Sequence, residues 1–341
     1  MKTATDQPVS EVKAAIPRRT KLTYWLRNRA ADLAPFATLA ILVIFFGLAS
    51  DSFLDIYNLR NILSQIATLS IVATGMTFVL LCGQIDLSVA AIATMTGVIA
   101  ANLFSEAKLP EIVAILAGVV VAGIFGIVSG WGTTKVGLPS FMMTLVAMQV
   151  ANGAALFISK GKINYNIPPL LKSLGSEYLG PIPLVVVMGA IVLIIGYVVL
   201  TYTRFGRYVY MTGSNRTGAE LSGINTKLII GSCLAISGVC AGVAGMLNTG
   251  RLGSAQSYGL DSFLLDSITA VVLGGTSLFG GQGGIKNTVI GLLVFGVLSN
   301  GLNQIQLDIY IRLLIAGLIL LAALLINSYA MKLRSTKTEV E

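Results

Sequence analysis

The chain has 341 residues, of which 55% are hydrophobic and only 11% are Asp, Glu, Lys or Arg. Soluble globular domains carry about 25% charged residues, so this composition excludes an ordinary soluble domain, and the low charge excludes a disordered chain. Histidine is absent, which excludes Ser-His-Asp and Cys-His catalysis and histidine-ligated metal sites. The composition predicts an all-α polytopic membrane protein.

Ten stretches without a charged residue predict about ten transmembrane helices, because a spanning helix needs about 20 mostly apolar residues. The stretches are Leu33–Ser50, Asn61–Ile85, Leu87–Ser105, Ile112–Thr134, Val136–Ser159, Tyr178–Thr203, Leu228–Gly250, Ser267–Ile285, Asn287–Leu307 and Leu313–Met331. The eighth, residues 267–285, contains Gly-Gly pairs at 274–275 and 280–281. We expect it to form a short or broken helix.

The distribution of Lys and Arg predicts that both termini are cytoplasmic. In that orientation the inside segments hold 16 of the 23 Lys and Arg residues, as the positive-inside rule requires. Residues 1–32 are expected to be a flexible basic cytoplasmic tail, since this polar region is too long for the n-region of a signal peptide. Residues 33–331 then form a single transmembrane domain, and 332–341 form a short cytoplasmic tail.

Uncharged amides within the spans are candidates for lining a route across the membrane. Gln149 and Asn152 lie three residues apart in the fifth span and therefore share a helix face. Such a face would suit a neutral hydroxylated solute, but amides also form hydrogen bonds between helices, and both interpretations stay open. For Asn300, Asn303 and Gln304 in the ninth span we favour interhelical bonding.

Asp86 lies between two apolar runs with almost no loop, in Ile85-Asp86-Leu87-Ser88. Asp86 or Ser88 either caps the next helix in a turn at the membrane surface or lines the translocation pathway. Small residues in the fourth and seventh spans predict close helix packing. They are Gly126, Gly130, Gly238 and Gly242.

No phosphate-binding loop of the Gly-x4-Gly-Lys-Ser/Thr type is present, so a partner would have to power any uphill transport. The largest inside connection, residues 204–227, is the place where such a partner would dock. Asn215 is expected to cap a short helix that runs through Ser222, and Gly223 to end it. Ala219 and Leu221 would be exposed to the partner, unless the segment is simply a solvated loop.

Three segments resemble the ribose/xylose/arabinose-type permeases of bacterial ABC importers. They are Arg204–Asn225, the run Gly83–Val89, and the run Ala270–Gly281. The resemblance covers roughly residues 36–330. It implies a second permease subunit, identical or different, two cytoplasmic ATPases that bind ATP and Mg²⁺, and a periplasmic or lipid-anchored sugar-binding protein, in the bacterial inner membrane.

The resemblance also implies which residues contact the ATPase. They are Asn215, Ala219, Leu221, Ser222, Gly223 and Ile224. The implied chain is no enzyme and binds no cofactor or metal itself. It moves a neutral monosaccharide or a sugar-like solute by alternating access. A secondary transporter of small neutral solutes is the alternative, although such proteins carry ionisable groups within the membrane, and only Asp86 is a candidate here. A membrane-embedded enzyme and a passive channel fit the sequence less well.

Overall fold

The computed structural model describes residues 36–325 apart from 309, 316, 320 and 323–324. The tails expected at 1–32 and 332–341 lie outside the described residues. Apart from a two-stranded hairpin, the described elements are helical. They are α2 (Ile56–Leu81), α3 (Val89–Ser105), α4 (Glu111–Trp131), the π-helix η1 (Gly132–Val136), α5 (Ser140–Ser159), α6 (Pro169–Ser176), β1 (Tyr178–Leu179), β2 (Ile182–Pro183), α7 (Leu184–Tyr202), α8 (Arg204–Ser214), α9 (Arg216–Leu221), α10 (Thr226–Leu252), α11 (Ser262–Leu273) and α12 (Ile285–Gln304).

Each charge-free stretch corresponds to an apolar helix, but the helices differ in length. Six are long and apolar enough to cross a membrane: α2, α4 with η1, α5, α7, α10 and α12. The shorter apolar helices have 10–17 residues and are Phe36–Ala49, α3, α11 and Tyr310–Ile319. Much of the tenth stretch, to Met331, lies outside the described residues. The molecule is a polytopic helical bundle.

Helix α10 lies at the centre of the bundle and packs against α2, α3, α4 and α6. Its contact with α4 is made through the small residues singled out from the sequence. A Cβ added to Gly126 would lie 2.6 Å from the carbonyl oxygen of Leu234, and one added to Gly238 would lie 2.6 Å from that of Ala122. Gly130 and Gly242 lie at the same contact, so the two backbones approach as closely as small residues allow.

The segment expected at 267–285 is a short helix followed by a loop. Helix α11 ends at Leu273, and the glycine-rich residues 274–284 are not helical. The predicted start of this span was wrong, because α11 begins at Ser262 and includes Asp266. A search for charge-free stretches cannot find a helix that carries a carboxyl group in its second turn.

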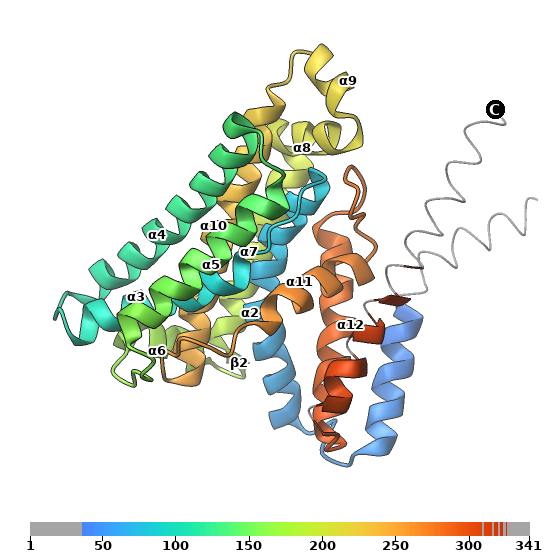
Figure 1. Ribbon diagram of the computed structural model, residues 1–341. Helices are drawn as coiled ribbons and strands as arrows, with labels where there is room; N and C mark the ends of the chain where they lie inside the picture. Colours follow the sequence, from blue (N-terminus) through green and yellow to red (C-terminus); the bar gives the residue numbers. More distant parts are fainter. Residues whose placement is uncertain (1–35, 309, 316, 320, 323–324, 326–341) are drawn as a thin grey trace, which may run out of the picture.

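The bundle has two distinct ends (Figure 1). The α9 end carries α8, α9, and the loop 274–284. The α6 end, opposite it, carries α6 and the hairpin of β1 and β2, in which Tyr178 pairs with Pro183 and Leu179 with Ile182. Connections that the sequence assigns to the inside, at Lys135, 204–227 and Lys286, lie at the α9 end.

Candidate functional site

The short helix expected after Asn215 is present as α9, and its caps explain its limits. The Asn215 side-chain oxygen accepts a hydrogen bond of 2.9 Å from the backbone N–H of Gly218. This bond satisfies one of the N–H groups that a helix start leaves unpaired. Gly223 follows with a φ of +81°, a left-handed conformation that favours glycine, and the chain turns there toward α10.

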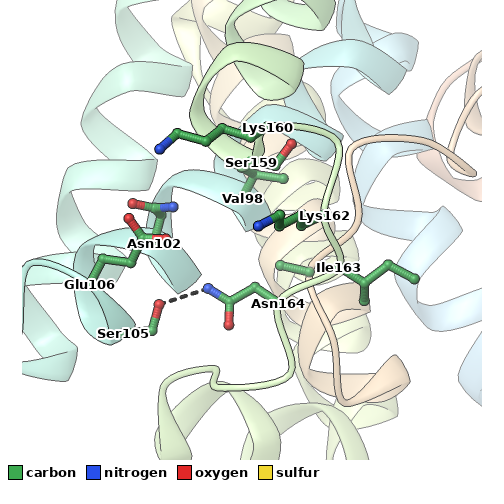
Figure 2. A pocket seen from close by; sticks show the side chains of 10 residues that line it. Val98, Asn102, Ser105, Glu106, Ser159, Lys160, Lys162, Ile163 and Asn164 are labelled. Carbon is green, nitrogen blue, oxygen red and sulfur yellow. Dashed lines mark hydrogen bonds between the residues drawn. The ribbon is translucent and has the colours of Figure 1, made fainter.

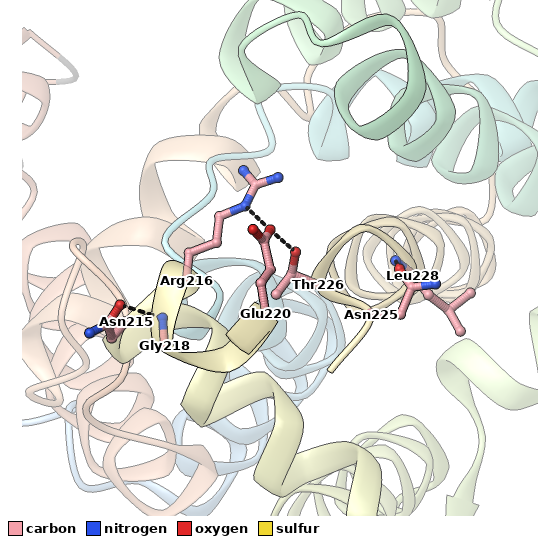
Figure 3. Close-up of polar contacts among 7 residues, drawn as sticks. All are labelled: Asn215, Arg216, Gly218, Glu220, Asn225, Thr226 and Leu228. Carbon is pink, nitrogen blue, oxygen red and sulfur yellow. Dashed lines mark hydrogen bonds and ion pairs between the residues drawn. The ribbon is translucent and has the colours of Figure 1, made fainter. Parts of the chain in front are cut away.

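Helix α9 is also bonded to the start of α10 (Figure 3). The Thr226 hydroxyl donates to Glu220 Oε1, and Arg216 Nε lies 3.2 Å from the same oxygen. These two contacts, with Thr226 the larger, hold the pKa of Glu220 below its ordinary value of 4.5. The Asn225 side chain accepts a bond of 3.0 Å from Leu228 N and caps α10. Helix α9 is therefore bonded at both ends.

The two residues expected to face a partner differ sharply in exposure. Leu221 is 86% exposed, whereas Ala219 is only 1% exposed. The prediction that Ala219 is exposed was wrong, because the face of α9 that carries it packs onto the bundle. Ile224 is half-buried against the core beneath α9. Of the six residues assigned to docking, Asn215, Leu221, Ser222 and Gly223 are exposed, so the available surface is the outer side and C-terminal end of α9.

Asp86 and Ser88 lie in the irregular connection between α2 and α3, and each is 1% exposed. One Asp86 oxygen accepts bonds from the Ser88 backbone N–H and from the Ser88 hydroxyl, at 2.9 Å and 2.5 Å. The turn is buried within the protein and contacts the start of α5. Ser88 is the N-cap residue of α3, but its side chain makes no capping bond. This geometry favours the structural interpretation of Asp86, in which the carboxylate fixes the turn that starts α3.

Gln149 and Asn152 lie on the outer face of α5, where Gln149 is exposed and Asn152 half-buried. Ser159 and Lys160 follow on the same side of the helix by the 3.6-residue period. Leu156, which is 51% exposed, lies between them on this side, so the polar residues form two separate groups, one at the middle of α5 and one at the α6 end. Neither group meets Asp86 or Ser88, so the four residues suggested as lining a pathway do not form one site. By contrast, the amides of Asn300 and Asn58 form two reciprocal bonds of 2.9 Å and 3.0 Å between α12 and α2, as expected for Asn300.

A polar cavity of about 300 Å³ opens where this face of α5 ends. Figure 2 shows Asn102, Ser105 and Glu106 from α3 and its C-terminal end opposite Lys160 and Lys162 from the segment after α5. Asn164 closes one side, since its amide donates to the Ser105 hydroxyl at 2.7 Å. Hydrogen-bond donors and acceptors thus surround a space of the size that a small polar molecule occupies.

Two comparisons place this chain among known proteins. A family model described as the permease component of branched-chain amino acid transport systems matches residues 58–324. The chain belongs to this family. The permease is 36% identical over 299 residues to the ribose import permease of Haemophilus influenzae, with 86% of this chain and 92% of that protein covered.

Other relatives carry different sugars in their names. The D-allose transport system permease of Escherichia coli is 35% identical over 86% of this chain and 90% of its own. The fructose import permease of Rhizobium meliloti is 32% identical over 92% of this chain and 89% of its own. No solved structure matches the permease. The permease is accordingly a multi-pass membrane component of a transport system, and the resemblance to ribose-type ABC permeases is confirmed.

Two features of the permease were not predicted from the sequence. The cavity at the α6 end is built from residues that are dispersed along the chain, and only the tertiary arrangement of α3 and α5 brings them together. Ser140 and Thr144 are the second feature, since their hydroxyls accept hydrogen bonds from the backbone near Asp86. Their spacing of four residues placed them on one helix face, but nothing in the sequence identified what that face contacts.

Proposed function

We propose that this permease is the membrane-spanning subunit of an ATP-binding-cassette importer in the bacterial inner membrane. Its cargo is a neutral monosaccharide or a sugar-like solute, which an extracytoplasmic binding protein delivers. Two permease subunits, identical or different, stand above two cytoplasmic ATPases that bind ATP with Mg²⁺. The α9 end then faces the cytoplasm, and the permease itself carries out no chemistry.

The observation that carries this proposal is the construction of α9. A single apolar side chain, Leu221, is 86% exposed on a helix of six residues. A solvated loop would not need caps at both ends or the bonds that Glu220 accepts from Thr226 and Arg216. A braced helix that presents one large apolar group is typical of a protein contact, in which such side chains supply much of the binding energy.

Transport by alternating access requires a weak polar site that is exposed to each side in turn. The amides of Gln149 and Asn152 on α5 and the cavity at the α6 end support such a route. Amides and hydroxyls bind a sugar through many bonds that are each modest, so the solute can leave again. The names of the ribose, allose and fructose relatives support a sugar as the cargo.

Substitution of Leu221 tests the proposal. In Leu221→Asp the permease should reach the membrane at normal level, because this side chain makes no core contact, while co-purification of the ATPase and sugar uptake should fall at least about tenfold. Leu221→Met keeps the apolar contact and is the matched control. Normal ATPase association and uptake in Leu221→Asp would exclude docking through α9. Uptake driven by an ion gradient in vesicles that lack the ATPase would overturn the whole proposal in favour of a secondary transporter.

A further inference from the structure

Three segments of the chain contact one another through backbone atoms at the α9 end. They are the last turn of α8, the loop 274–284 and the C-terminal end of α2. The Gly281 N–H donates to the Leu81 carbonyl oxygen at 2.9 Å. A Cβ added to Gly213 would lie 1.8 Å from that same oxygen and 2.8 Å from Gly281 N. No side chain fits between these three backbone segments.

Tyr210 adds a side-chain bond to the same contact. Its hydroxyl, on α8, donates to the Gly283 carbonyl oxygen at 2.9 Å. Burial raises the pKa of this phenol above its ordinary value of 10.0, so the hydroxyl keeps its proton at neutral pH and remains a donor. The loop is thus bonded to both α8 and α2.

Helix α8 continues directly into α9, because Asn215 ends one and starts the other. Its backbone N–H donates to the Met211 carbonyl oxygen at 3.1 Å, while its side chain caps α9 at Gly218. A displacement of α9 therefore acts on the last turn of α8, where Gly213 and Tyr210 lie.

On the other side, the segment that leaves α2 is bonded to the start of α5. The backbone N–H of Ile85 donates to the Ser140 hydroxyl at 3.2 Å, and that of Leu87 donates to the Thr144 hydroxyl at 3.1 Å. Both hydroxyl-bearing residues are buried. Helix α5 is the helix that carries Gln149 and Asn152 on its outer face.

We propose that these contacts form a coupling junction through which a displacement of α9 reaches α5. The coupling junction consists of Tyr210 and Gly213 on α8, the loop 274–284, residues 81–88, and Ser140 and Thr144 on α5. The inference rests on the proposed function, since the ATPase is the partner that displaces α9. Tyr210 and Thr144 are positioning residues in it, and neither contacts the sugar.

Physical continuity distinguishes this route from mere proximity. Backbone contacts without an intervening side chain cannot absorb a displacement through rotamer changes, and packed interiors are nearly incompressible. The contacts run from α9 through α8, the loop and residues 81–88 to the buried hydroxyls of Ser140 and Thr144 on α5, and a contiguous network of this kind can carry energetic coupling between two sites. The buried turn at Asp86 is part of this junction, because it orients the backbone N–H groups of Ile85 and Leu87 that donate to α5.

Two variants test the junction in the complete complex, reconstituted with its ATPase and binding protein. Tyr210→Phe removes the bond to Gly283, and Thr144→Val removes the hydroxyl that accepts from Leu87 N and also donates to the Ser140 carbonyl oxygen. The quantity measured is sugar taken up per ATP hydrolysed, with ribose, allose and fructose as the probes. Membrane level and ATPase co-purification should stay unchanged, while this ratio should fall about fivefold in each variant.

Matched controls separate coupling from general damage. Tyr208→Phe alters an exposed tyrosine on the same helix, and Thr68→Val removes a hydroxyl bonded only within α2; both should keep the normal ratio. Thr144→Ser retains the hydroxyl and should restore it. An unchanged ratio in Tyr210→Phe and Thr144→Val would overturn the junction, as would loss of the ATPase from these variants. Failure of the unmodified complex to show any ATP-dependent uptake would instead refute the proposed function.

Discussion

The loop 274–284 at the α9 end and the cavity-lining segment after α5 at the α6 end are held by different kinds of contact. At the α9 end the loop 274–284 contacts α2 and α8 backbone to backbone, with Gly213 and Gly281 at the closest approach. At the α6 end the segment after α5 meets the segment after α10 at a single antiparallel pair, Asn164 and Ala255, with bonds of 3.0 Å and 2.8 Å. Polar side chains and a cavity of about 300 Å³ lie beside this pair. Helix α6 itself packs closely on α10, since a Cβ added to Gly250 would lie 1.8 Å from the Leu171 carbonyl oxygen.

This difference teaches how one chain can combine a rigid part with an open one. Where backbone meets backbone, an added methyl group has no space, and the packing energy depends on every atom. Where polar side chains surround a cavity, water can replace a lost hydroxyl at little cost. The loop 274–284 and the lining of the cavity should therefore respond very differently to equally small changes.

The largest effect is expected from Gly213→Ala at the α9 end. The new Cβ would collide with the Leu81 carbonyl oxygen, 1.8 Å away, and relief requires that α8 move from α2. We expect a loss of about 3 kcal/mol in the free energy of unfolding, measured by thermal unfolding in detergent. Gly231→Ala in α10 is the matched control, because no atom lies within 4 Å of its added Cβ. A Gly213→Ala permease as stable as this control would refute the backbone contact.

A smaller effect is expected from Ser105→Ala at the α6 end. The variant removes the 2.7 Å bond that the Asn164 amide donates to the Ser105 hydroxyl. The amide borders the cavity, however, where a water molecule can accept a hydrogen bond from it. The free energy of unfolding should fall by no more than about 0.5 kcal/mol. The same thermal measurement applies. A loss above about 2 kcal/mol would mean that this contact excludes water and that the cavity lining does not differ from the loop 274–284 in its tolerance of small changes.

The sequence predicted those parts of the structure that depend on local chemistry. Charge-free stretches located the apolar helices, and Asn215 and Gly223 located the two ends of α9, because caps act over three or four residues. Where the prediction failed, distant residues decide the outcome. Ala219 is buried because α9 packs onto the bundle. Asp266 lies within α11, but the search for charge-free stretches left it out, because no local pattern shows that a helix with a carboxyl group is packed in the bundle.

The same limit explains what was found at the candidate site. Gln149 and Asn152 could be placed on one helix face. The cavity near the end of that face is also lined by residues of α3, and the sequence of one helix does not show which helix packs beside it. The coupling junction could not be predicted either. Nothing in the sequence shows that Leu81, Gly213 and Gly281, which lie far apart in the chain, are in contact in the fold. Local rules find elements and caps, whereas contacts between distant backbones require the folded chain.

The smallest effect concerns the exposed carboxylate of Glu220, whose pKa lies below 4.5 chiefly because Thr226 donates to it and secondarily because Arg216 does. A lowered pKa in the folded state means that this contribution to stability is complete at neutral pH. It is lost only as the pH falls below the ordinary value and through the folded one. Carbon-13 titration of Glu220 by NMR in detergent should therefore give a pKa below 4.5, and Thr226→Val should raise it toward that value.

Salt distinguishes the two causes of this shift, because screening weakens an exposed ion pair but leaves a hydrogen bond largely intact. At about 1 M salt most of the shift should survive in the unmodified permease, while in Thr226→Val the remainder should disappear. A shift that vanished in salt without any substitution would assign it to Arg216 alone. The hydrogen bond from Thr226 would then contribute nothing to holding α9 on α10, because the Arg216–Glu220 ion pair lies within α9, and the rigid character attributed to the α9 end would stop at Asn215.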